Sequence, residues 1–196
     1  MPQKKWLVLG AIFALIVLSM RAELHVPNMI PIGALALWAG AYLGKRCAVL
    51  LIYGLMLIGD AGNLIHGRYP WWLAATVYTA MLVYVVFGAA LARHIPNGWR
   101  KMGGSLIAAC AGSLVYFIVT NGAVWAFSTL VSEGWYPKST AGFITCLTAG
   151  IPFWRNDLLV NAGGAVIFFG VSALITATSR ARTSAVVWQA ASGSQQ

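Results

Sequence analysis

Few side chains in this sequence are able to recognise a solute, and most of them stand beside long apolar runs. The candidates carry carboxylate, amide, guanidinium, imidazole or aromatic groups, and they are His25, Asn28, Asp60, Asn63, Asn121, Trp125, Tyr136 and Arg155. Amides and a guanidinium group supply hydrogen bonds, and aromatic rings stack on planar molecules. The set predicts a binding pocket for a small water-soluble molecule.

Residue spacings typical of catalysis are missing from the sequence. It contains no Ser-His-Asp set, no HExxH zinc helix, no P-loop and no glycine-rich dinucleotide fingerprint. The three cysteines, Cys47, Cys110 and Cys146, are widely spaced and form no CxxC pair, so we expect buried free thiols, with reactive thiols as the alternative. We therefore expect no enzyme, no metal site and no cofactor.

The composition excludes a soluble globular protein. Of the 196 residues, 60% are hydrophobic and 9% are charged, and the mean hydropathy is +0.77, whereas soluble domains carry about 25% charged residues. Basic residues occur singly or in pairs and form no stripe for nucleic acid. A bilayer-spanning helix needs about 20 apolar residues. We expect one membrane domain over residues 1–179 and a disordered cytoplasmic tail over residues 180–196.

The apolar runs predict an all-α integral membrane protein with six transmembrane helices. Six runs are long enough to span once their flanking residues are included, and they lie at residues 6–20, 27–44, 47–64, 71–92, 102–130 and 158–178. They are expected to be helical because unpaired backbone groups are costly in lipid. A seventh run, 140–153, is short and interrupted by Gly142, Gly150 and Pro152. It predicts a half-buried outer segment that enters the bilayer and returns before the last helix.

The charges predict the orientation. Six spans with a cytoplasmic N-terminus place most basic residues inside, namely Lys4, Lys5, Lys45, Arg46, Arg93, Arg100, Lys101, Arg180 and Arg182. The outer side then receives Arg21, Arg68, Lys138 and Arg155, together with the acids Glu23, Asp60, Glu133 and Asp157. We expect an inner-membrane protein with both termini in the cytoplasm. The first run lacks a signal-peptide cleavage site and is expected to remain as a helix.

Several polar residues admit two interpretations. Asp60 is either a functional intramembrane acid or a residue at the membrane boundary. Asn121 either stabilises a break in the fifth helix or points its amide at a ligand. Asn156 and Asp157 are expected to cap the last helix, while Arg155 either pairs with an acid, Asp60 or Glu23, or grips a ligand.

Small residues recur at four-residue spacing, which places them on one face of a helix. The sets are Gly10 and Ala14; Ala36, Gly40 and Gly44; and Gly104, Ala108 and Gly112. Such faces let a second helix approach closely. The spacing is typical either of packing within the monomer or of a docking face for a partner subunit.

Four segments carry a resemblance to a known group of proteins. They are HVPNMIPIGALALWAGAYL at 25–43, VTNGAVW at 119–125, YPKSTAG at 136–142 and IPFWRN at 151–156. Over roughly residues 25–170 the chain resembles small bacterial inner-membrane proteins that are similar to the S components of energy-coupling factor vitamin transporters. The resemblance implies a six-helix fold whose outer loops close over a vitamin-like ligand.

The resemblance also implies partners and a first ligand to try. S components dock on a transmembrane partner through small residues of helix one, commonly AxxxA, which Gly10 and Ala14 approximate. A solitary branch looks like a cobalamin transporter that uses an outer cysteine, which this chain lacks between Asp60 and Tyr84.

The sequence thus predicts a membrane substrate-binding and transport protein for a small water-soluble vitamin or related metabolite, with cobalamin as the first candidate. Its expected partners are the lipid bilayer, a small-molecule ligand and energising transporter subunits that contact the small-residue faces. No nucleic acid is expected. The alternative is a non-transport accessory subunit of a larger membrane complex.

Overall fold

The computed structural model describes residues 2–23, 28–65, 70–130 and 136–193, and this part of the chain is all-helical. Its elements are α1 (Pro2–Glu23), α2 (Ile32–Tyr42), α3 (Lys45–Ile65), α4 (Trp71–His94), α5 (Trp99–Ala126), a 3-10 turn η1 (Ser128–Leu130) and α6 (Thr140–Gly193). The predicted all-α class is therefore confirmed.

Three of these helices are long and apolar enough to cross a membrane. They are α4, α5 and the Thr140–Ala185 part of α6. Their exposed side chains include Val86, Ile107, Ile118 and Ile167, as expected of surfaces that face hydrocarbon. Length and composition together indicate a membrane protein.

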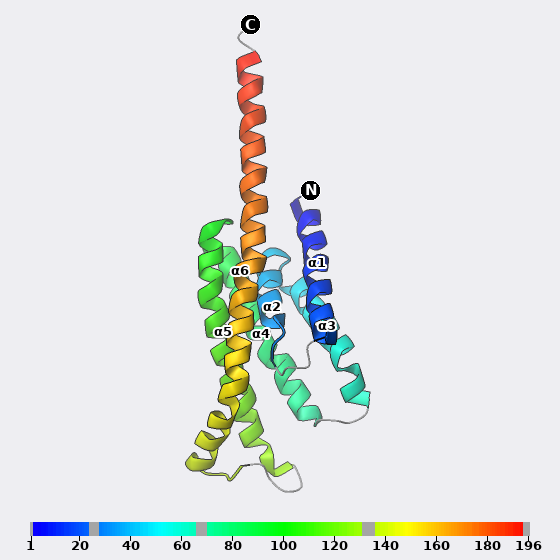
Figure 1. Cartoon of the computed structure of the whole chain (residues 1–196), viewed down its shortest axis with the longest axis vertical. Coiled ribbons are helices and arrows are strands. Elements are labelled where there is room, and N and C mark those ends of the chain that lie inside the picture. The colour runs from blue at the N-terminus through cyan, green and yellow to red at the C-terminus, as the bar shows by residue number, and fades with distance from the viewer. Residues whose placement is uncertain (1, 24–27, 66–69, 131–135, 194–196) are drawn as a thin grey trace.

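Successive helices run in opposite directions along the long axis of the bundle (Figure 1). The N-terminus and the extended C-terminal part of α6 lie toward the same end, which we call the basic end. This end also holds the α2–α3 turn and the α4–α5 connection (Figure 1). Lys4, Lys45, Arg93 and Arg100 belong to the helix ends that meet there. The opposite end, where α1, α3 and α5 finish, is called here the far end.

The short helix α2 is the centre of the bundle. It has 11 residues, or about 16 Å at 1.5 Å per residue, and it contacts α1, α3, α4, α5 and α6. The six residues from Ala34 to Ala39 have no exposed surface. The second span expected over 27–44 is thus a half-length helix surrounded by the others.

Glycines allow α2 and α4 to meet backbone to backbone. A Cβ atom on Gly88 of α4 would lie 2.0 Å from the carbonyl oxygen of Leu37, and one on Gly40 of α2 would lie 2.4 Å from that of Val85. Neither position has room for a side chain. The four-residue spacing in the second run therefore serves packing within the monomer, while Gly44, with φ +82°, forms the turn to α3.

The small residues of α1 are also covered by the chain itself. Gly10 lies against Trp38, whose ring carbon would be 3.1 Å from a Cβ atom at that position, and Ala14 is 7% exposed. Trp38 also packs edge to face on Phe13 and donates a hydrogen bond from Nε1 to Oγ of Ser172 at 2.8 Å. This arrangement joins α1, α2 and α6 near the basic end.

Helix α6 differs from two expectations. The segment 140–153 does not enter and return, but forms the first turns of a 54-residue helix that contains Pro152. A proline inside a helix removes one backbone hydrogen bond and kinks the axis, and Figure 1 shows α6 changing direction near this start. Residues 180–193, expected to be disordered, continue α6 to Gly193, since adding a residue to a formed helix is far easier than nucleating a new one.

Candidate functional site

A buried carboxylate lies at the junction of three helices. Asp157 of α6 is 6% exposed. Its Oδ2 accepts hydrogen bonds from Oη of Tyr84 at 3.1 Å and from Oγ of Ser113 at 2.6 Å, and its Oδ1 accepts one from Nδ2 of Asn161 at 2.9 Å. Within the described residues no cation pairs with Asp157. Three donors therefore stabilise the carboxyl group in place of a counter-ion.

The amino end of α2 joins this network. The backbone N–H of Ala34 donates to Oδ1 of Asn161 at 2.8 Å, so Asn161 bridges the first turn of α2 and the carboxyl group of Asp157. The four groups Tyr84, Ser113, Asp157 and Asn161 are called here the central network. Because the amino end of a helix carries partial positive charge, the network places its acid near a favourable dipole.

The central network lies halfway along the bundle. Tyr84 is near the middle of α4 and Ser113 near the middle of α5. The Tyr84 ring packs against two glycines, because a Cβ atom would lie 2.7 Å from it at Gly33 and 2.6 Å from it at Gly112. Helix α2 therefore begins halfway along the bundle.

This geometry corrects the capping prediction for Asn156 and Asp157. Both residues lie well inside α6, which begins at Thr140, so neither is at a helix end. Sequence reasoning missed Tyr84, Ser113 and Asn161 as site residues. The available signal was the four-residue spacing of Asp157 and Asn161 within an apolar run, which places both on one helix face.

A seam of matched residues extends from the central network toward the far end. Ser113, Phe117 and Asn121 recur every four residues on α5, and they meet Asp157, Trp154 and Gly150 of α6 in that order. The Phe117 and Trp154 rings stack with centroids 5.2 Å apart, and a Cβ atom on Gly150 would lie 2.4 Å from Oδ1 of Asn121. We call these six residues the α5–α6 seam.

Trp154 holds an unused donor in this seam. Its Nε1 is buried and has no hydrogen-bond partner within the described part of the chain. Trp154 precedes Asp157 by three residues, so both lie on the same face of α6. A buried N–H without an acceptor costs about 1–3 kcal/mol, and the position is suited to an acceptor atom of a bound molecule.

Asn121 does not interrupt α5, which is continuous from Trp99 to Ala126. Its Nδ2 donates to the backbone carbonyl oxygen of Phe117 at 2.9 Å, and the backbone carbonyl oxygen of Asn121 accepts from Sγ of Cys146 at 3.3 Å. The helix-break interpretation is therefore wrong, and the Asn121 amide faces α6. Cys146 is buried as expected, whereas Cys47 and Cys110 are exposed.

Trp125 and Tyr136 take part in closing the far end of α5. Trp125 donates from Nε1 to the carbonyl oxygen of Pro137 at 3.0 Å. Ser128 donates to the carbonyl oxygen of Tyr136 at 3.0 Å. Lys138 donates to the carbonyls of Trp125 and Ala126, and its ammonium lies 5.2 Å from the Trp125 ring centre. These contacts satisfy carbonyls at the end of the helix.

Asn28 and Arg155, two further predicted site residues, lie apart from the central network. Asn28 is exposed, has φ +57°, and donates from Nδ2 to the carbonyl oxygen of Phe153 at 3.5 Å, while Arg155 is exposed on α6. His25 and the side chain of Asn63 fall outside the described residues. The structure therefore brings Asn121 to the seam and groups Trp125 with Tyr136, and the six predicted site residues whose side chains it describes form no single cluster.

Asp60 is buried, and Arg21 is its partner. Arg21 of α1 forms an ion pair with Oδ1 of Asp60 on α3, and Tyr78 of α4 donates to Oδ2 at 3.2 Å. The arginine crosses Gly59, where a side chain would collide with it. The suggested pairing of Arg155 with Asp60 is thus replaced by a contact that joins α1 to α3.

We predict that Arg21→Gln lowers the free energy of unfolding by up to about 1 kcal/mol, because the Arg21 side chain is 27% exposed and water screens the pair. Thermal unfolding in a mild detergent measures the change. In a cycle with Asp60→Asn, the double variant should lose less than the sum of the single variants. Arg155→Gln, at an exposed arginine on α6, is the control and should leave the unfolding temperature unchanged. Additive losses in the cycle would show that Arg21 and Asp60 do not interact.

The central network and the α5–α6 seam contain carboxylate, hydroxyl, amide and indole N–H groups able to form hydrogen bonds, together with stacked aromatic rings. Among the described residues, no group of three or more His, Cys, Asp or Glu is placed to hold a metal ion.

Comparison with known proteins identifies the family of the chain. A family model matches residues 1–185. The chain belongs to DUF6580, a family of unknown function. No curated protein and no solved structure matches it. In this DUF6580 member, the central network lies within the matched range.

Proposed function

We propose that this protein binds a small water-soluble molecule inside its membrane domain and carries it across the bilayer. The observation that carries the proposal is the central network, a buried carboxyl group at mid-depth of the bundle, bonded to the helix that begins there. Ionisable groups inside membranes are expensive and usually mark a path for a solute or an ion.

The half-length α2 supports the same proposal. Transporters commonly build their sites from helices that begin or end near the bilayer midplane, because the exposed helix ends and the irregular chain beside them recognise polar solutes. Non-helical backbone at such depth persists only where protein or a polar cavity surrounds it. The chain that leads into α2 at Asn28 contacts α6 through Phe153.

The proposed topology is six crossings, with the basic end in the cytoplasm. Helices α1 and α3 have 22 and 21 residues, which is about 30 Å at 1.5 Å per residue and matches the hydrocarbon core. Because α2 is too short to cross the bilayer alone, the second crossing also includes the chain that leads into α2. The concentration of lysine and arginine at the basic end supports a cytoplasmic location in a bacterial inner membrane.

The proposed ligand class is a water-soluble vitamin or related metabolite, with cobalamin the first to be tried. The class follows from the resemblance to S components of vitamin transporters, and two features of the seam are compatible with it. Stacked aromatic rings at Phe117 and Trp154 suit a planar group, and the free Nε1 of Trp154 and the Asn121 amide suit polar substituents of a ligand.

The test is native mass spectrometry of the detergent-purified protein after incubation with pooled water-soluble vitamins, cobalamin included. We expect one ligand mass to be retained. Trp154→Phe should weaken its retention about fivefold to tenfold, because the variant keeps an aromatic ring, although a smaller one, and loses one donor. Because the smaller ring also loses part of the stacking on Phe117, the unfolding temperature is measured on the same samples and retention is compared where both proteins are folded.

Trp99→Phe is the matched control, because Trp99 is 54% exposed at the opposite end of α5. It should leave both retention and unfolding temperature unchanged. A folded wild-type protein that retains no vitamin would contradict the proposed ligand class. Equal retention by wild type and Trp154→Phe would contradict the assigned site.

A further inference from the structure

An apolar groove runs between α4 and α5 near the basic end. It has a volume of about 380 Å³, and its walls include Phe87, Ala90, Leu91, Gly104, Ile107 and Ala111. Gly104 keeps it open, because a Cβ atom there would lie 2.6 Å from Cδ1 of Ile95. Both helices are long and apolar enough to cross a membrane, so the groove faces lipid if they do.

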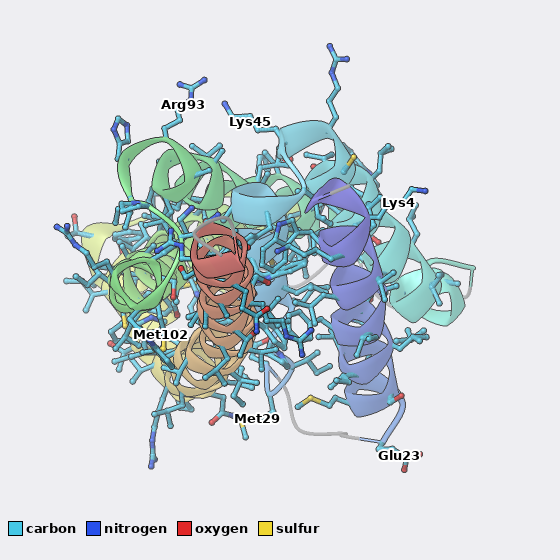
Figure 2. All side chains as sticks on the ribbon, turned by 90° about the horizontal axis from the view of Figure 1, so that it is seen from above. Lys4, Glu23, Met29, Lys45, Arg93 and Met102 are labelled. Atoms are coloured by element: carbon cyan, nitrogen blue, oxygen red, sulfur yellow. The ribbon has the colours of Figure 1, made fainter. Side chains whose placement is uncertain are left out.

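A basic pocket adjoins one end of this groove. It has a volume of about 120 Å³ and is formed by Lys45, Val86, Ala89, Ala90, Arg93 and His94. Ala90 and His94 line both the pocket and the groove, so the two are neighbours on the surface of α4. Figure 2 shows Lys45 and Arg93 extending from the same side of the bundle.

We infer that the groove and the pocket together form a binding site for an anionic phospholipid. An acyl chain lies in the apolar groove, and the phosphate is held by Lys45 and Arg93, with His94 at the boundary between the two. Basic pockets beside membrane helices bind anionic headgroups in this way. An anionic phospholipid matches both parts of the site, because its acyl chain fits the apolar groove and its phosphate pairs with Lys45 and Arg93. An apolar helix in the groove would leave these two cations without a partner.

The dimensions agree with one partly bound acyl chain. Gly104 to Ala111 covers about 10 Å along α5 at 1.5 Å per residue, so the groove holds the part of the chain nearest the headgroup. The rest of the lipid remains in the bilayer. The site lies near the basic end, whereas the α5–α6 seam extends toward the far end, and the assignment of the lipid site does not depend on vitamin binding.

The test compares phosphatidylglycerol with phosphatidylcholine of the same acyl chains, added to delipidated protein in a neutral detergent and detected by native mass spectrometry. Phosphatidylglycerol should be retained more than phosphatidylcholine. Lys45→Gln with Arg93→Gln should reduce that preference by about fivefold for each cation removed. Arg46→Gln, at the neighbouring exposed residue outside the pocket, should leave it unchanged.

Groove variants separate the acyl chain from the headgroup. Ala90→Trp fills the shared wall and should reduce retention of both lipids, while Ala92→Trp on an exposed position of the same helix should not. All of the substituted residues are exposed, so folding is expected to persist. Equal retention of the two lipids by the wild type, or the same loss from Arg46→Gln as from Arg93→Gln, would overturn the assignment.

Discussion

Asp157→Ala is expected to destabilise the protein by about 3–5 kcal/mol, the combined cost of three buried donors that lose one shared acceptor group. The substitution leaves the hydroxyls of Tyr84 and Ser113 and the amide of Asn161 without their acceptor. Each buried donor that loses its partner costs about 1–3 kcal/mol. Because the network connects α4, α5 and α6 to the start of α2, the variant should unfold in a single transition at a lower temperature than wild type.

Thermal unfolding in detergent, followed by circular dichroism, measures this effect. Asp157→Asn is the graded variant, since its side chain has the same shape and keeps one acceptor oxygen, and it should lose less than Asp157→Ala. Thr148→Ala is the control on the same helix, because Thr148 is exposed and bonds only its own helix. An Asp157→Ala protein as stable as wild type would show that the carboxyl group does not hold these helices together.

The Asp157→Asn variant also tests the proposed binding of a vitamin. If the vitamin proposal is correct, Asp157→Asn should retain the ligand more weakly than wild type at a temperature where both are folded. Measuring retention and unfolding on the same samples separates a binding defect from a folding defect. Unchanged retention in folded Asp157→Asn would place the ligand away from the central network.

Gly88→Ala is the second change with a large expected effect. The added Cβ would lie 2.0 Å from the carbonyl oxygen of Leu37, a separation that requires the α2 and α4 backbones to move apart. Helix α2 is enclosed by five other helices and has no free direction in which to shift. Overpacking of a tight core costs about 1–3 kcal/mol, and more when backbone must move. We expect a loss of about 3 kcal/mol or failure to fold.

Gly54→Ala provides the matched control on α3. A Cβ atom at Gly54 would meet nothing within 4 Å, and alanine is the better helix former by about 1 kcal/mol. The variant should be as stable as wild type or more stable. Yield of monodisperse protein and unfolding temperature would be compared for the two alanine variants. Equal behaviour would contradict the close α2–α4 contact.

Local features of the sequence were sufficient for the class of the protein and for much of its helix layout. Apolar length, few charges and the four-residue spacing of small residues are properties of neighbouring positions, and each has a direct physical meaning in a membrane. The predicted runs at 47–64, 71–92 and 102–130 fall close to α3, α4 and α5. In α6 the same reasoning failed, because Gly142, Gly150 and Pro152 resemble a break that the packing against α5 overrides.

The candidate site was only partly accessible from the sequence. Asn121 was recognised as an amide inside an apolar run, and the structure brings it to the seam. Trp154 could not be singled out from the sequence, since whether its Nε1 finds an acceptor depends on every group packed around it. Asp157 was assigned to a cap because the segment before it resembled a loop.

What the sequence by itself determined is the helical membrane character, the gathering of basic residues toward one end and the crowding of glycine and alanine in the second run. What only the tertiary structure decided is which polar groups meet. Tyr84 and Ser113 are 73 and 44 residues from Asp157, Ala34 is 127 from Asn161, and Arg21 is 39 from Asp60. Periodicity describes one helix face at a time, whereas these contacts depend on how the helices cross and rotate against one another.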